Sequence, residues 1–322
     1  MRALAWLLVV AALGVSPSAL ADGGGRATDL AHGFGSLWTT SPGAIVRLDA
    51  RTGRMAAKLG AGPAPLSAIT TGAGAVWGLL PWTVLRVDPR SGALRRFHVP
   101  GPAYAFAIGF GKVWVARYDD GTLYALDPAS GEIVRAVAGI PSAVEAVSVG
   151  RGSVWVVSVG PWRRGPGGTL VPRGPGTLSR ISPTSGKILA RIRVGRGAGA
   201  VAVGTRTVWV ANFRGVGSDS SLSRIDLRTN HVAATIRLPA RPVAVEAGAG
   251  FVWTVIGADA AGRIVRVDPR TNRTVVRRVP RSWVPSAVAV FRGRVWVASG
   301  GSATVTRFNP RTLASQTFSI PR

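Results

Sequence analysis

The sequence predicts an all-β fold, a seven-bladed β-propeller of four-stranded antiparallel blades. A Val-Trp or Leu-Trp step recurs seven times, at intervals of 39, 37, 41, 54, 44 and 43 residues. An Asp-Pro-x-Ser/Thr-Gly/Asn turn, or a variant of it, keeps the same period. Two markers that repeat in phase indicate one structural unit used seven times. The tryptophans are Trp38, Trp77, Trp114, Trp155, Trp209, Trp253 and Trp296, and the turns begin at Asp49, Asp88, Asp127, Ser182, Asp226, Asp268 and Asn309.

Each unit reads as four short strands. An Ala/Val run such as 287–290 leads through a Gly-rich turn to the Trp-bearing strand, such as 208–211. A third strand such as 222–226 then leads through the Asp-Pro turn to a fourth, such as 232–236. Runs of Val, Ile, Thr and Trp bounded by Gly, Pro, Asn and Asp are typical of strands. In a ring, neighbouring blades cover both faces of each small sheet, so we expect the tryptophans to pack between blades.

The N-terminus predicts export. Residues 1–21 begin with Arg2, continue with an apolar run of 13 residues, and end in the small-x-small step Ala19-Leu20-Ala21. This pattern is typical of a cleaved signal peptide, and the run is too short to span a bilayer as a helix. We therefore expect a signal peptide at 1–21 and a propeller domain at 22–322, secreted to the periplasm or the exterior as a monomer with no transmembrane segment.

The composition excludes several classes of site. The chain has no Cys and three His, which excludes a disulfide scaffold, thiol catalysis and a multi-histidine metal centre. With 47% hydrophobic and 17% charged residues it is too apolar for a disordered chain. Lys plus Arg is 40 against 14 for Asp plus Glu, a net charge of +26. An excess of Arg over Lys this large also fits a GC-rich genome.

Most of the informative residues are explained by architecture. The turn Asp residues can accept hydrogen bonds from the amides of their own turn. Two residues before the turn, six of the seven units carry an Arg, which can reach its own turn or a neighbouring blade through an ion pair or a carbonyl contact. These arginines are Arg47, Arg86, Arg180, Arg224, Arg266 and Arg307.

The fifth unit resembles a known repeat family. Its segments Val208-Trp209-Val210-Ala211-Asn212 and Leu222-Ser223-Arg224-Ile225-Asp226 are similar to YVTN-type propeller repeats, with Trp in place of the usual Tyr. The Gly-x-Gly-x-Val-Trp step also resembles the seven-bladed streptogramin (virginiamycin B) lyases. That second resemblance implies a Glu three positions after the Trp and a magnesium ion held near paired His and Glu. The present sequence never has Glu there, so no catalytic residue is assigned.

A ligand site is expected on the face that carries the loops between second and third strands. The fourth unit has a Gly/Pro-rich insertion at about 160–176, which we expect to be a surface loop, and the third unit has an Asp-Gly turn signal. Arg, Trp and Tyr together suit an anionic or aromatic ligand. The candidate ligand-binding residues are Arg117, Tyr118, Asp119, Asp120, Glu145, Trp162, Arg163, Asn212 and Arg214.

Three functions remain open at the level of sequence. We favour a non-catalytic binding module that contacts a protein, a glycan or an anionic polymer at the cell surface and needs no cofactor. The first alternative is a lyase- or lactonase-like enzyme with Mg²⁺ or Ca²⁺ at the loop-bearing face. The second is a polyanion binder, because ten Arg and Lys residues are predicted to gather on the opposite face. No nucleic-acid-binding motif accompanies them, so nucleic acid is the least favoured polyanion.

Overall fold

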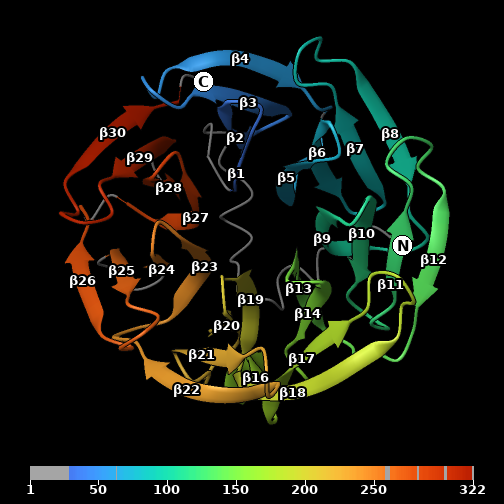
Figure 1. The fold of residues 1–322 in the computed structure, drawn as a ribbon, viewed down its shortest axis with the longest axis vertical. Coiled ribbons are helices and arrows are strands. Elements are labelled where there is room, and N and C mark those ends of the chain that lie inside the picture. Colours follow the sequence, from blue (N-terminus) through green and yellow to red (C-terminus); the bar gives the residue numbers. More distant parts are fainter. Residues whose placement is uncertain (1–28, 63, 258–261, 281–282, 301–302, 321–322) are drawn as a thin grey trace.

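The fold is a seven-bladed β-propeller, as the repeat predicts. A computed structural model describes residues 29–62, 64–257, 262–280, 283–300 and 303–320, so the predicted signal peptide lies outside the described residues. Within these residues, seven four-stranded antiparallel sheets are arranged in a ring around a central axis (Figure 1). The first strands of neighbouring blades contact one another around this axis, and β27 contacts β1 where the ring closes.

Among the first four blades, only blade 4 contains an inserted hairpin in addition to its own four strands. Blade 1 comprises β1 (Leu30–Gly33), β2 (Ser36–Ser41), β3 (Ala44–Asp49) and β4 (Met55–Gly60). Blade 2 comprises β5 (Ala68–Gly72), β6 (Ala75–Leu80), β7 (Thr83–Val87) and β8 (Leu94–His98). Blade 3 comprises β9 (Ala103–Gly109), β10 (Lys112–Arg117), β11 (Leu123–Leu126) and β12 (Ile133–Val137). Blade 4 comprises β13 (Val144–Gly150), β14 (Ser153–Ser158), β17 (Pro175–Ile181) and β18 (Ile188–Arg196).

The last three blades follow the same order without an insertion. Blade 5 comprises β19 (Ala198–Val203), β20 (Thr207–Asn212), β21 (Ser221–Asp226) and β22 (His231–Arg237). Blade 6 comprises β23 (Pro242–Gly248), β24 (Phe251–Ile256), β25 (Arg263–Val267) and β26 (Thr274–Arg278). Blade 7 comprises β27 (Pro285–Phe291), β28 (Arg294–Ser299), β29 (Thr304–Phe308) and β30 (Ser315–Ser319).

The tryptophans of the repeat form the core between blades, as predicted. All seven side chains are at most 1% exposed, and each packs in an apolar cluster that joins its own blade to the next. In five blades the indole Nε1 donates to the carbonyl of a residue five positions earlier, for example from Trp77 to Gly72 at 2.9 Å. This bond satisfies the one polar atom of a buried indole.

The repeated turn is held by its own side chain. In the five Asp turns, the Asp Oδ1 accepts from the amides two and three residues later, and Asn309 does the same in blade 7. These hydrogen bonds hold the pKa of the five Asp carboxyls below the usual value. The predicted structural role of this turn is therefore confirmed.

Four of the six repeated arginines join neighbouring blades, while Arg47 donates to Ser36 Oγ of its own blade at 2.8 Å. Arg224 of blade 5 donates to the Pro269 carbonyl at 3.0 Å and to Asn272 Oδ1 at 2.9 Å, both in the turn of blade 6. Arg180 and Arg266 reach the turns of blades 5 and 7 in the same way. Arg307 of blade 7 donates to a carbonyl of blade 1, that of Arg51, at 2.8 Å. The contact is thus with the next blade and not with the arginine's own turn, and the last one spans the closure of the ring.

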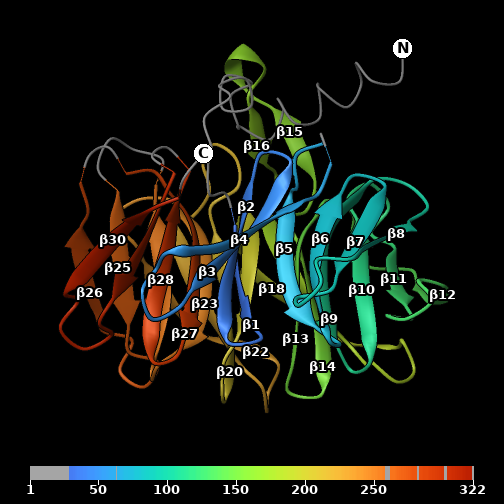
Figure 2. The same ribbon diagram turned by 90° about the horizontal axis from the view of Figure 1, so that it is seen from above.

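The insertion of blade 4 is more regular than expected. In place of an irregular loop, it forms the antiparallel hairpin β15 (Trp162–Arg164) and β16 (Leu170–Pro172), with the short 3-10 helix η1 (Pro166–Gly168) between them. The difference arises because Trp162 and the backbone of Leu170 both have partners on neighbouring loops. The hairpin projects from one end of the ring, which we call the loop face, while the opposite end, the turn face, carries the Gly-rich and Asp-Pro turns (Figure 2).

Candidate functional site

The candidate site begins with a bulge that recurs at the loop-face end of the first strands. In blades 3 to 7 the pairing of the first and second strands shifts by one residue there. The residues at this bulge are Tyr104, Glu145, Gly199, Val243 and Ser286. A bulge redirects a side chain relative to the pleat. The Tyr104 phenol of blade 3 and the Glu145 carboxylate of blade 4 thus occupy equivalent positions in adjacent blades.

Arg214 joins these two bulge residues from blade 5. Its Nε lies 2.8 Å from Glu145 Oε2, and its Nη2 donates to the Tyr104 hydroxyl. Gly199 makes this geometry available, because a Cβ at that position would stand 2.5 Å from Arg214 Cγ and 2.8 Å from the Phe213 ring. Because Gly199, at the bulge of blade 5, has no side chain, the Arg214 side chain can occupy this space.

The polar cluster extends outward to the inserted hairpin. The rings of Tyr104 and Tyr118 lie 5.0 Å apart, and Trp162 Nε1 donates to the Tyr118 hydroxyl at 3.1 Å. The hairpin also rests on the second-to-third-strand loop of blade 5, where the amide of Val216 donates to the carbonyl of Leu170 at 3.1 Å. Side chains from blades 3, 4 and 5 are thus connected in one cluster under the hairpin.

The electrostatics of the cluster are those of a buried ion pair. The Glu145 side chain is 2% exposed and that of Arg214 is 15% exposed. Burial raises the pKa of Glu145, and Arg214 opposes that rise. Burial also raises the pKa of Tyr104, with a smaller contribution from the Glu145 carboxylate, so this phenol stays protonated at neutral pH. Removing either member of such a pair would leave a buried charge without a partner.

The cluster is therefore better suited to holding the loop-face segments in place than to acid–base catalysis. Glu145 is held by a guanidinium, and the tyrosine beside it does not ionise near neutral pH. A general acid or base needs a pKa near the working pH and access to a substrate. Glu145 has one further oxygen, Oε1, which is buried and has no hydrogen-bond partner among the described residues.

The structure brings together four of the nine predicted site residues, Tyr118, Glu145, Trp162 and Arg214. The others lie apart from this cluster or at its edge. Arg117 pairs with Asp120 at 2.8 Å within one turn, and both Asp119 and Arg163 are exposed.

Asn212 is placed differently from the expectation. Its side chain is fully buried, and its Nδ2 donates to Ser221 at 2.9 Å and to Ser223 at 3.0 Å inside blade 5. These contacts hold the Asn212 side chain in the interior of blade 5, at the loop-face end of β20. Its Oδ1 has no hydrogen-bond partner among the described residues.

Sequence reasoning missed Tyr104, the residue that links both halves of the cluster. Its strand resembles an ordinary inner strand, and the bulge that redirects Tyr104 leaves no signal in a single sequence.

Two further acidic residues were also not singled out from the sequence. Burial raises the pKa of Asp29 to about 6, against hydrogen bonds from the amides of Ile69 and Leu30. Burial raises the pKa of Glu246, on the inner strand of blade 6, to about 7.

In the described part of the chain, no three His, Asp or Glu side chains come together in a group that could hold a metal ion. The same residues include no helix of the length and apolarity that a membrane crossing requires.

Comparison with known proteins identifies the fold and no closer relative. No family model and no curated protein match the sequence. The WD40 domain of Pan2 from Neurospora crassa superposes with a TM-score of 0.66 at 14% identity, covering 86% of each chain. The WD40 repeats of RRP9 give a TM-score of 0.67 at 12% identity, covering 87% of this chain and 89% of that one. The computationally designed Ika8 protein gives 0.64 at 16% identity, covering 92% and 88%.

These likenesses bear on architecture alone, because identities of 12 to 16% carry no information about a ligand. The similarity to YVTN-type repeats and to streptogramin lyases stays a similarity of motifs. The chain is a seven-bladed β-propeller that is structurally similar to WD40 propellers.

Proposed function

We propose that the protein is an exported, non-catalytic binding module whose loop face contacts an acidic segment of another protein. The observation that carries the proposal is the hairpin β15–β16, which is fixed to the ring at two separate points. A surface loop without a function would not need the buried Glu145–Arg214 pair and the two tyrosines beneath it to hold its conformation. Long loops held in this way are disproportionately used for recognition.

The chemistry of the hairpin supports an acidic partner. Arg163, Arg164 and Arg173 are all exposed on it, and no residue of 160–176 is acidic. Next to the hairpin, Val216 is 55% exposed and supplies an apolar contact. Arginine and exposed apolar side chains are enriched at protein interfaces, and complementary charge guides the encounter. Export is supported by the signal-peptide pattern at 1–21, and a non-catalytic role by the paired state of Glu145.

The test compares two charge-reversal variants. One replaces Arg163, Arg164 and Arg173 by Glu. The control replaces Arg193, Arg237 and Arg278, which are exposed on the outer strands, and changes the net charge equally. The ligand is a fluorescent peptide of twelve Glu and three Leu residues, and binding is measured by anisotropy at 0.15 M salt.

We expect the hairpin variant to lose at least tenfold in affinity and the control variant less than threefold. An equal loss in both variants would show that the peptide senses only the overall charge, which would refute the proposal. Tight binding of the peptide to a variant that lacks 160–176 would refute it as well.

A further inference from the structure

The turn face carries two cavities that the proposed function does not use. The larger one has a volume of about 690 Å³ and lies between blades 5 and 6. The second has a volume of about 420 Å³ and lies between blades 6 and 7. Ala249 lines the second cavity, while its neighbours in the same turn, Gly248 and Gly250, line the first. The two cavities are therefore consecutive, one blade apart, and share a turn.

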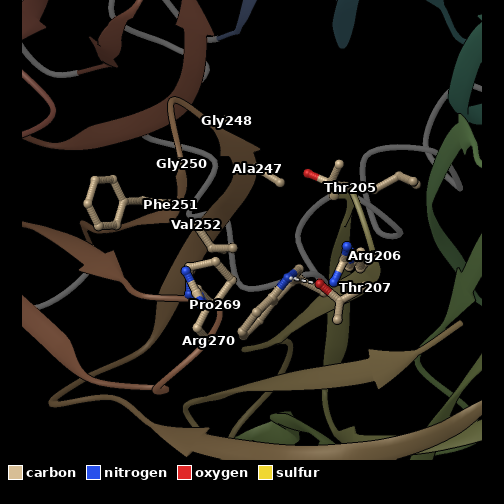
Figure 3. A pocket seen from close by; sticks show the side chains of 13 residues that line it. Thr205, Arg206, Thr207, Ala247, Gly248, Gly250, Phe251, Val252, Pro269 and Arg270 are labelled. Carbon is tan, nitrogen blue, oxygen red and sulfur yellow. Dashed lines mark hydrogen bonds between the residues drawn. The ribbon is translucent and has the colours of Figure 1, made fainter.

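The blade 5 turn that lines the first cavity departs from the repeat. In five other blades the indole Nε1 binds the carbonyl of the residue that ends the first strand. In blade 5, Trp209 Nε1 donates instead to Thr207 Oγ1 at 2.9 Å, and the amide of Gly204 donates to the Thr207 carbonyl at 2.8 Å. The connection from 203 to 207 is consequently wider than a Gly-x-Gly turn. Figure 3 shows Thr205, Arg206 and Thr207 on one side of the cavity, and Phe251, Pro269 and Arg270 on the other.

Both cavities present arginine pairs without acidic lining residues. Arg206 and Arg270 line the first and are exposed. Arg294 and Arg311 line the second and are exposed. Neither set of lining residues includes Asp or Glu. In the first cavity Arg206 comes from blade 5 and Arg270 from the Asp-Pro turn of blade 6, whereas in the second cavity Arg294 and Arg311 both come from blade 7.

The neighbouring turn carboxylates leave these arginines available. Asp268 lies two residues before Arg270, but its Oδ1 accepts from the amides of Arg270 at 2.7 Å and Thr271 at 3.1 Å. In blade 7 the equivalent residue is Asn309, which makes the same two turn contacts without a charge. The substitution of Asn for Asp removes a negative charge beside Arg311 at the second cavity. The turn beside the second cavity therefore carries one negative charge fewer than the equivalent turns of blades 5 and 6, which favours an anionic ligand there.

We propose that these two cavities form a binding site for an acidic polysaccharide that bears sulfate or phosphate groups, with one anionic group in each cavity. Guanidinium groups bind tetrahedral oxyanions through paired N–H donors. The hydroxyls of Thr205 and Thr207 and the backbone of the turns offer hydrogen-bond partners for sugar hydroxyls. Two consecutive sites favour a chain over a single anion, because the second contact is made at high effective concentration.

Nucleic acid is a poorer fit to the same space. Single-stranded nucleic acids bind through aromatic faces on which bases stack. In the first cavity the Trp209 indole is fully buried, and the Phe251 ring is covered by the Arg266 guanidinium at 4.6 Å. The Trp209 indole therefore offers no face to a base, and one face of the Phe251 ring is already occupied by Arg266.

The experiment measures binding of defined hexamers by isothermal titration calorimetry. The probes are a heparin hexasaccharide, its desulfated form, a phosphorylated hexasaccharide and a single-stranded DNA hexamer. The test variant is Arg206→Gln with Arg270→Gln. The control is Arg90→Gln with Arg151→Gln, two exposed arginines of the same face that line neither cavity. The single change Arg206→Gln serves if the double variant does not fold.

We expect the test variant to bind the heparin hexasaccharide or the phosphorylated hexasaccharide about tenfold more weakly, a difference of about 1.4 kcal/mol, with less than a twofold loss in the control. The probe with the larger loss identifies sulfate or phosphate as the preferred group, and the desulfated hexasaccharide should not bind. Equal losses in test and control would overturn the proposal, since they indicate diffuse attraction to the whole face. DNA binding that is as tight as either oligosaccharide and equally sensitive to Arg206→Gln would overturn it too.

Discussion

Replacing Arg214 by Leu tests whether the buried ion pair holds the loop face together. The change removes the 2.8 Å contact to Glu145 and the donor to Tyr104, and it leaves a carboxylate with a 2% exposed side chain without its guanidinium. Breaking a buried pair by removing one partner costs about 3–5 kcal/mol. For a domain of this size that corresponds to a fall of about 5–8 °C in Tm.

The loss should depend on pH in a defined direction. Burial already raises the pKa of Glu145, and without Arg214 nothing opposes that rise. A carboxyl whose folded pKa is raised contributes stability below its unfolded pKa, and this contribution is lost as pH rises through the folded pKa. The variant should therefore be closer to the parent protein at pH 5 than at pH 8.

The assay is thermal unfolding followed by circular dichroism at pH 5, 7 and 8. The double variant Glu145→Gln with Arg214→Leu should recover part of the loss at pH 8, because it buries no charge. Arg196→Ala serves as a control, since the Arg196 side chain is 55% exposed in its pair with Asp219 and surface pairs contribute about 0–1 kcal/mol. A loss below about 0.5 kcal/mol for Arg214→Leu, or one that does not change with pH, would refute this account of the cluster.

Three further changes probe other parts of the structure. Gly199→Ala places a Cβ 2.5 Å from Arg214 Cγ, so Tm should fall and the fluorescence of Trp162 above the cluster should change; an unchanged spectrum and Tm would contradict the proposed packing. Arg307→Gln removes the bond to blade 1 and should increase amide exchange at both chain ends more than Arg224→Gln does, and equal exchange in the two variants would argue against it. Burial raises the Glu246 pKa to about 7, so the parent protein should lose up to about 3 kcal/mol of stability as pH rises from about 5 to 8. Glu246→Gln should abolish this loss. Parallel pH profiles of Tm for the parent and the variant would disprove this expectation.

The repeated elements of the fold were predictable because each is determined locally. A tryptophan after a Gly-rich turn, and an aspartate whose carboxylate binds its own turn, are signals within ten residues of sequence. Seven copies of them specify blade number and strand order. The partner of the repeated arginines required one more step, since Arg224 reaches an atom of the next blade, 45 residues away in sequence.

The candidate site was predictable only in its outline. Tyr118, Trp162 and Arg214 were found because unusual residues in unusual loops stand out from the repeat. Tyr104 was missed because a bulge depends on the pairing of two strands and not on the residue type. The burial of the Asn212 side chain could not be predicted, because a position at the end of a second strand can face either the blade interior or the loop, and the two serines that bind it lie on another strand.

The closure of the ring by packing and hydrogen bonds has a consequence for how the gene could be rearranged. Every blade is built from strands that follow one another in the chain, and the contact between blades 7 and 1 resembles the contacts elsewhere. A circularly permuted chain, with 320 joined to 29 by a short linker and new ends between two other blades, should reach the same architecture. The blade numbers would then record only the position of each blade along the chain, and they would not rank the blades by stability.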